Sequence, residues 1–351
     1  MSRLKNIFLT GMIFIILGAS VFLTSSIVKG KTWKDKGMME TIVLPDSEIM
    51  QRASLGYTNL AADLIWLRTI RYINIHNKGD KKYPELPRFF KLITDLDENF
   101  KDIYRVGGEA LRELSKDPKS SISLLEKGRS IYPDDWKIAY ESGRSYSLTN
   151  QWELATKSFE ESLKMPEAPE WIAIHVAEGY YRQRDYMKSL YWWFRISSTT
   201  NNKEVAAMAR SKVLYLDTLI PAIRIAESCK LFWEKYRRLP HDPEELVRAG
   251  FLDFVPEEPF NGRFVIDRKN FTIESTYISS LLLNCLEELS AKVRMYKDKH
   301  GNYPVSIDDL KNDEELGLNF PMHPYEGEYY IDHSSKRVMS TKDYLARIEI
   351  N

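Results

Sequence analysis

The sequence predicts a mainly α-helical protein with an N-terminal transmembrane helix, a solenoid of stacked helix pairs and two small α+β modules that form an internal duplication. Three observations support this prediction. A long uncharged run lies near the N-terminus, residue sizes recur with a period near 34 in the middle of the chain, and a long phrase near the C-terminus occurs twice. The predicted parts are a transmembrane anchor (1–28), a linker (29–47), helical repeats (48–218), a first α+β module (219–278) and a second (279–351).

The N-terminal run, "IFLTGMIFIILGASVFLTSSIV" over residues 7–28, carries no charge and is long enough to cross a bilayer as a helix. A removable signal peptide has a shorter apolar region followed by a small-x-small cleavage site, so we expect an uncleaved membrane anchor. The Ser/Thr-rich stretch at 24–26 leaves cleavage open. Ser20 occupies the position where a lipoprotein has its lipidated cysteine, so we expect no lipid anchor.

The orientation of the anchor is not decided by charge. Positive residues lie on both sides of the run, with Arg3 and Lys5 before it and Lys29, Lys31, Lys34 and Lys36 after it. The positive-inside rule therefore selects neither orientation. N-terminal anchors of bacterial single-span proteins commonly leave the body outside the cytoplasm. We therefore expect a single-pass inner-membrane protein with an extracytoplasmic body.

The composition limits the classes of partner. The 351 residues are 43% hydrophobic, enough for two or three domains with cores. Lys plus Arg equals Asp plus Glu at 50 each, and this balance lacks the basic excess typical of nucleic-acid-binding proteins. We expect no nucleic-acid partner, and we expect the abundant Tyr and Trp to pack between helices and, secondly, to recognise protein.

The region after the linker begins with an amphipathic helix over residues 47–73. Asp46 or Ser47 would cap it, and apolar residues recur at three- and four-residue spacing. That apolar series comprises Leu60, Leu64, Leu67 and Ile70. A shorter helix is predicted to start near Pro84 or Pro87, where the first turn tolerates proline. This pair is expected to cap or extend the repeats.

Three units of the middle region, over about 101–200, place small and large residues in the same order. The small positions are Gly108, Gly143 and Ala177, then Ser121, Ala155 and Ser189; the large ones are Leu125, Phe159 and Trp193. The order resembles the tetratricopeptide repeat (TPR), in which two antiparallel helices cross closely at small residues and bulky ones fill the gap. An irregular helical domain would match by chance only, and three aligned units favour the repeat.

The TPR resemblance implies that the first helix of each unit lines a concave face that binds a protein partner. The family's groove positions fall in this sequence on Asp102, Arg105, Glu109 and Arg112, on Lys137, Tyr140, Arg144 and Ser147, and on Trp171, Ile174, Glu178 and Tyr181. The set lacks the Lys/Arg clamp of members that bind chaperone tails, so that ligand is not expected. For each position taken singly, a solvated helix face is the alternative.

The duplicated phrase occupies residues 232–267 and 296–332. Matched pairs at a spacing of 64 are Pro240/Pro304 and Leu246/Leu310, and those at 65 are Pro256/Pro321, Pro259/Pro324, Gly262/Gly327 and Asp267/Asp332. Each copy predicts a long helix (about 219–237 or 279–299), a short helix, a loop between prolines and a strand, with residues 271–273 or 337–339 as a second strand.

This order resembles the C-terminal part of type II secretion major pseudopilins and related type IV pilin-like proteins. "GNYP" at 301–304 fits their phrase, and "PEEPFNG" and "PMHPYEG" keep both prolines and the glycine. Neither copy has the aspartate before the second proline, so no calcium site is expected. The N-terminal run also lacks the pilin processing signature, so the chain is not itself a pilin.

No motif for catalysis appears: the sequence has no phosphate loop, nucleophile elbow or dinucleotide turn. His323 and His333 lie near acidic residues but are expected to be solvated loop histidines. Cys229 and Cys285 leave open both a disulfide and two buried free thiols. We expect no enzyme and no catalytic, cofactor-binding or metal-binding residues.

These patterns predict a membrane-anchored TPR scaffold for protein–protein interaction in a bacterial envelope assembly, with secretion or the type IV pilus as the most concrete case. One alternative is a regulatory or accessory subunit of an envelope enzyme, which predicts a pocket with converging polar groups. The other is a structural spacer, which predicts a concave face without exposed aromatic residues.

Overall fold

A computed structural model describes residues 44–318 and 320–350, and the predicted anchor at 7–28 lies outside these residues. Among the described residues, no helix is long and apolar enough to cross a membrane. The chain divides into two units, residues 1–45 and 46–351, and every element named below belongs to the second unit.

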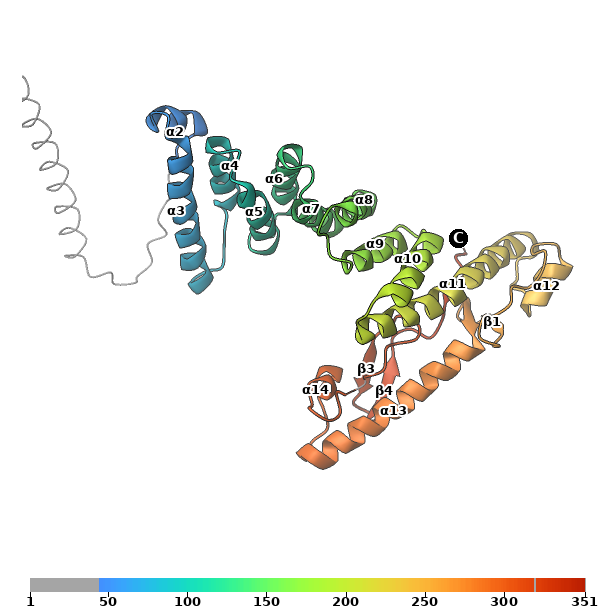
Figure 1. The fold of residues 1–351 in the computed structure, drawn as a ribbon. Coiled ribbons are helices and arrows are strands. Elements are labelled where there is room, and N and C mark those ends of the chain that lie inside the picture. The colour runs from blue at the N-terminus through green and yellow to red at the C-terminus, as the bar shows by residue number, and fades with distance from the viewer. Residues whose placement is uncertain (1–43, 319, 351) are drawn as a thin grey trace, which may run out of the picture. The chain divides into compact units, whose positions relative to one another are not determined.

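The first part of this unit is entirely helical (Figure 1). Its helices are α2 (Ser47–Ala53), α3 (Thr58–Lys78), α4 (Leu86–Leu96), α5 (Lys101–Glu113), α6 (Pro118–Ile131), α7 (Trp136–Leu148), α8 (Trp152–Lys164), α9 (Ile172–Arg182), α10 (Tyr186–Thr199) and α11 (Lys203–Tyr236). Consecutive helices from α3 to α11 pack against one another. The result is a series of helix hairpins, as the period predicted.

The start of the helical part differs from the prediction of one helix over 47–73. The chain turns between α2 and α3, where Leu55 (φ 51°) and Gly56 (φ 93°) adopt left-handed backbone conformations. Two such residues in succession end a right-handed helix. The start of α4 agrees with the prediction, because Pro87 lies in its first turn.

The predicted small and large positions meet at the helix crossings. A Cβ atom on Gly108 would lie 2.6 Å from Leu125, and one on Gly143 would lie 2.6 Å from Phe159. Both contacts are closer than packed carbon atoms allow, so only glycine permits these crossings at their present separation. The bulky residue of each second helix therefore fills the space left by the small residue of the first.

The small hydroxyl residues of the second helices reinforce the crossings. The Ser121 hydroxyl donates to the Gly108 carbonyl at 2.7 Å, and the Ser189 hydroxyl donates to the Ala177 carbonyl at 2.9 Å. In the third unit Ala177 takes the glycine position and belongs to the same buried core as Trp193. The same order of contacts in successive units makes this region a TPR-like helical repeat.

The C-terminal part contains the duplicated modules in the predicted order. After α11 come α12 (Pro243–Arg248), β1 (Phe264–Asp267) and β2 (Thr272–Ser275), and then α13 (Thr276–His300), α14 (Ile307–Lys311), β3 (Tyr329–Asp332), β4 (Arg337–Ser340) and β5 (Ala346–Arg347). The first long helix begins at Lys203 rather than near 219, because α11 continues through Pro221. The predicted boundary at 218/219 thus falls inside a helix.

The two copies share backbone conformations as well as residues. Arg237 (φ 54°) and Gly301 (φ 80°) end α11 and α13 in the left-handed region, although only one copy has glycine there. Phe271 and Lys336, at a spacing of 65, both have φ 57° in the turns between paired strands. The turns themselves are therefore duplicated.

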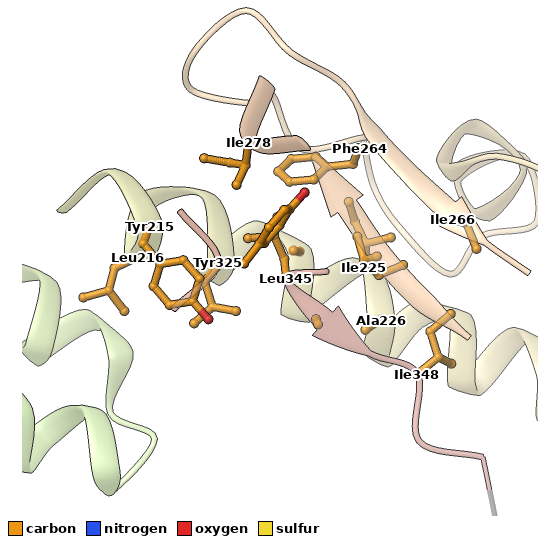
Figure 2. Close-up of a cluster of buried hydrophobic side chains, with 14 of the residues drawn as sticks. Tyr215, Leu216, Ile225, Ala226, Phe264, Ile266, Ile278, Tyr325, Leu345 and Ile348 are labelled. Atoms are coloured by element: carbon orange, nitrogen blue, oxygen red, sulfur yellow. The ribbon is translucent and has the colours of Figure 1, made fainter. Parts of the chain in front are cut away.

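The two modules are joined through their strands. β1 pairs with β2 (Phe264↔Ser275) and β3 with β4 (Tyr329↔Ser340), both antiparallel and at equivalent registers. β5, at the end of the second copy, pairs with β2 of the first copy. Figure 2 shows the core that results, in which residues from α11, both modules and the C-terminal segment pack together.

In the part of the chain that the structure describes, the outer edge of β4 in the second sheet has no partner strand like the one that β5 provides for β2 in the first sheet. Ile273 of β2 pairs with Ala346 of β5, whereas its equivalent in β4, Val338, donates its backbone N–H to the Ser290 hydroxyl at 3.0 Å. Ser290 belongs to α13, and the equivalent position of α11 is Ala226. The hydroxyl thus satisfies a buried amide that has no neighbouring strand.

Both cysteines are free thiols, so the disulfide alternative does not apply to this structure. Cys229 is buried and Cys285 is partly exposed. Burial raises the pKa of Cys229 to about 12, which keeps it protonated and unreactive at neutral pH.

Candidate functional site

A cluster of five rings joins the second and third repeats, and we call it the aromatic cluster. Its members are Trp136 and Tyr140 on α7, Phe159 on α8, Trp171 at the start of α9 and His175 on α9. The Tyr140 and Trp171 rings meet edge to face with centroids 5.0 Å apart, and the Phe159 and His175 centroids lie 5.1 Å apart. Two of the predicted groove residues, Tyr140 and Trp171, are therefore in contact across the repeat boundary.

Trp171 is the most accessible member of the cluster, with 45% of its surface exposed, while Tyr140 and His175 are partly buried. The Tyr140 hydroxyl and His175 Nε2 lie 3.1 Å apart and form a hydrogen bond. Burial lowers the pKa of His175, with a smaller contribution from the Arg144 charge, and burial raises the pKa of Tyr140. At neutral pH the cluster is thus apolar and uncharged.

Charged groups lie on α7 itself and on α5 of the preceding repeat. Arg144 on α7 donates to Glu113 on α5 at 3.1 Å, and Arg105 forms an ion pair with Glu109 one turn along α5 at 3.9 Å. All four side chains are at least partly exposed. The surface of the predicted groove therefore combines an aromatic part with a part that carries both charges.

Arg112 does not line this surface, which corrects its predicted role. Its side chain is fully buried and forms ion pairs with Glu141 at 2.7 Å and with Glu113 at 3.1 Å. It also donates to the Ser145 hydroxyl at 3.2 Å. The guanidinium joins α5 to α7 inside the stack, so its role is structural.

The remaining predicted positions are spread over other contacts. Ile174 packs against the large core, Glu178 pairs with Arg182 at 2.9 Å, and Tyr181 packs on Tyr186 with ring centroids 5.6 Å apart. None of the three belongs to the aromatic cluster. Asp102 and Lys137 are exposed, and the Ser147 hydroxyl donates to the Arg144 carbonyl of its own helix.

Trp136 and His175 were not among the predicted groove residues, and Phe159, which is buried beneath the other rings, was predicted only as a bulky residue at the helix crossing. His175 lies 35 residues after Tyr140, one repeat period away, so the period itself could have identified the pair. A further exposed apolar stripe on α10 follows helical spacing and was also missed; it comprises Met187, Tyr191 and Phe194.

An open groove of about 800 Å³ lies in the second module, between the loop before α14 and strand β3. His323 lines it, and burial lowers the pKa of His323 to about 4. Both nitrogens of its ring already form hydrogen bonds within the protein. Nδ1 accepts hydrogen bonds from the backbone amides of Tyr325 and Gly327, and Nε2 lies 2.7 Å from the Ser340 hydroxyl. His323 is therefore a brace for its loop rather than the solvated residue that was predicted.

Over residues 44–318 and 320–350, no group of three or more His, Cys, Asp or Glu side chains is arranged to hold a metal ion. The aromatic cluster presents rings and hydrogen-bonding groups without a nucleophile next to a base. Its chemistry suits recognition of a protein side chain.

The hairpins, their small-residue crossings and this surface define the class of the molecule as a TPR-like helical-repeat protein. No family model matches the chain. No curated protein matches it. Among solved structures it is similar to one described as "Functional Characterization of Pseudomonas Aeruginosa pilF", at 12% identity and a TM-score of 0.30, over 50% of this chain and 83% of that one. The class rests on the helix crossings at Gly108, Gly143 and Ala177.

Proposed function

We propose that this protein is a membrane-anchored scaffold of a bacterial envelope assembly, and that its aromatic cluster binds a protein partner. One observation carries the proposal: Trp171 is 45% exposed while it packs on Tyr140 of the preceding repeat. An indole held rigidly by a neighbouring ring offers a large contact area at little cost in conformational entropy. A structural spacer has no use for such a surface.

The composition of the surface indicates the chemistry of the partner. The neutral rings suit an apolar or aromatic side chain, and the Arg144–Glu113 pair suits a polar segment beside it. Trp, Tyr and Arg dominate the binding energy of known protein interfaces. The partner is therefore a protein segment with an apolar anchor residue flanked by polar residues.

The location and the assembly rest on the sequence. Residues 7–28 have the length and composition of a membrane-spanning helix. The order of helix, loop and hairpin in both C-terminal modules supports a secretion or type IV pilus assembly by analogy with pilin-like proteins.

The proposal is tested with the full-length protein in membranes of cells that express it. A photo-crosslinking amino acid replaces Lys137, which is exposed on α7 next to the cluster. We expect a crosslinked protein adduct that Trp171→Ala reduces by about tenfold or more, as a loss of about 1.4 kcal/mol in binding would give.

The matched control is Tyr191→Ala, which removes a more exposed ring, 61% against 45% for Trp171, from α10. The adduct should persist in this variant. If no adduct forms, or if both variants reduce it equally, the aromatic cluster is not the binding surface and the spacer is favoured.

A further inference from the structure

The outer face of α3 carries an apolar stripe that is exposed. Leu60, Leu64 and Leu67, part of the apolar series that the sequence shows at helical spacing, are 57%, 59% and 61% exposed. The helix packs against α4 through its opposite side, where Ala62 and Ile65 are buried. The exposed residues are therefore additional to those that hold α3 in the stack.

Such a face is unusual at the end of a repeat array. Terminal repeats normally present a polar outer surface, because an apolar one promotes association. Tyr57, the residue directly before α3, is also exposed. Tyr57 and the three leucines follow one another at intervals of three, four and three residues, which is the spacing of the a and d positions of a coiled coil. We call this line of a and d positions the seam.

We infer that α3 pairs with α3 of a second copy of this chain, parallel and in register. In a parallel coiled coil a g residue faces the e residue that lies five positions further along the partner helix. With Tyr57 at an a position, Asp63 (g) faces the partner's Arg68 (e). Both side chains are exposed and opposite in charge, so the two-fold pairing forms this ion pair twice.

The same register accounts for the remaining exposed apolar residues of the helix. Ile70 (g) faces the partner's Ile75 (e), and these two residues lie off the leucine seam and are exposed in one copy. After Leu67 the seam itself becomes polar, at Arg71 and Asn74. A polar seam position costs stability but selects one register over its alternatives.

The first test uses disulfide crosslinking of the full-length protein with Cys285→Ser as background, since Cys229 is buried. Leu60→Cys and Leu67→Cys, each alone, are expected to give disulfide-linked dimers under mild oxidation. Asn59→Cys, exposed on the same helix but outside the stripe, is the control and should stay monomeric. An antiparallel pair would crosslink a mixture of Leu64→Cys and Leu67→Cys chains instead, and that result would overturn the register.

The second test exchanges the charges and measures the mass of the purified protein by analytical ultracentrifugation. Asp63→Arg and Arg68→Asp are each expected to weaken the dimer by about tenfold, because each places like charges opposite one another twice. The double variant should restore the dimer. Circular dichroism should be unchanged in all three, since both residues are exposed.

A protein that is monomeric with and without these changes, and that forms no disulfide at Leu60→Cys, would overturn the inference. The stripe would then be covered by lipid or by the chain's own N-terminal residues. Dimers that persist in both single charge variants would show that another surface holds the copies together.

Discussion

Glu258 and His323 lie 65 residues apart at the same position of the duplicated phrase, and each holds its loop by the same contacts. The Glu258 carboxylate accepts the backbone amides two and four residues further on, at 2.8 and 2.7 Å, and His323 Nδ1 accepts the two equivalent amides, both at 3.1 Å. Each also bonds the equivalent hydroxyl, Ser275 or Ser340, at 2.7 Å. The duplication thus preserved a loop while changing the charge of the group that braces it.

Removal of the first brace should destabilise the protein. Glu258→Ala leaves two backbone amides and the Ser275 hydroxyl without their acceptor in a buried loop. We expect the free energy of unfolding to fall by about 2 kcal/mol or more, since each unpaired buried polar group costs about 1–3 kcal/mol. Urea denaturation followed by circular dichroism measures the loss.

Glu257→Ala is the matched control, because Glu257 is the adjacent residue and is exposed. It should change the free energy of unfolding by no more than about 0.5 kcal/mol. Equal effects of the two substitutions would contradict the role of the Glu258 contacts.

The second brace makes stability depend on pH. Burial lowers the pKa of His323 from 6.5 to about 4, so the unfolded chain binds the proton more readily than the folded chain. The contribution of His323 is therefore fully present above about pH 6.5 and is lost as the pH falls towards 4. Protonation of Nδ1 would also remove the acceptor of two backbone amides.

We expect the urea midpoint to fall less between pH 7 and pH 5 in His323→Gln than in the natural sequence, because glutamine does not titrate. His333→Gln, at an exposed histidine of the same module, should keep the natural pH dependence. If His323→Gln keeps it as well, another group is responsible.

The crossing of α7 and α8 depends on Gly143. A Cβ at this position would lie 2.6 Å from the Phe159 ring, so Gly143→Ala must separate the helices or displace the ring. We expect a loss of about 1–3 kcal/mol, the usual cost of overpacking, although alanine favours helix formation by about 1 kcal/mol. Thermal unfolding monitored by circular dichroism measures it.

Ser123→Ala serves as the comparison, since Ser123 is exposed on α6 and makes no helix crossing. This substitution should be neutral within about 0.5 kcal/mol. An increase in stability for Gly143→Ala would show that the crossing tolerates a methyl group.

Arg112 should act on folding rather than on binding. Arg112→Ala leaves the buried Glu141 with only the more distant Arg144 guanidinium, 3.8 Å away, and breaking a buried ion pair in this way costs about 3–5 kcal/mol. The double substitution Arg112→Leu and Glu141→Leu should lose clearly less, because no uncompensated charge remains. Urea denaturation of the three proteins distinguishes these outcomes, and a stable Arg112→Ala protein would return Arg112 to the binding surface.

The sequence by itself determined the features that depend on nearby residues. Proline and glycine restrict the backbone locally, so the duplicated phrase predicted both short helices, both loops and both hairpins. The period of small and large residues predicted the crossings at Gly108 and Gly143, because two adjacent helices can approach closely only where a side chain is missing. Tyr140 and Trp171 were likewise predicted on one surface, and they are in contact.

The tertiary structure decided what depends on contacts between distant segments. A spacing of three and four residues marks an apolar helix face but not what covers it, and on α3 that face is exposed. Arg112 has the spacing of a groove residue, yet its side chain is buried and forms an ion pair with Glu141 inside the stack. The pairing of β5 with β2 joins two modules that look separate in sequence, since a strand's partner is selected by the whole fold and not by its neighbours in the chain.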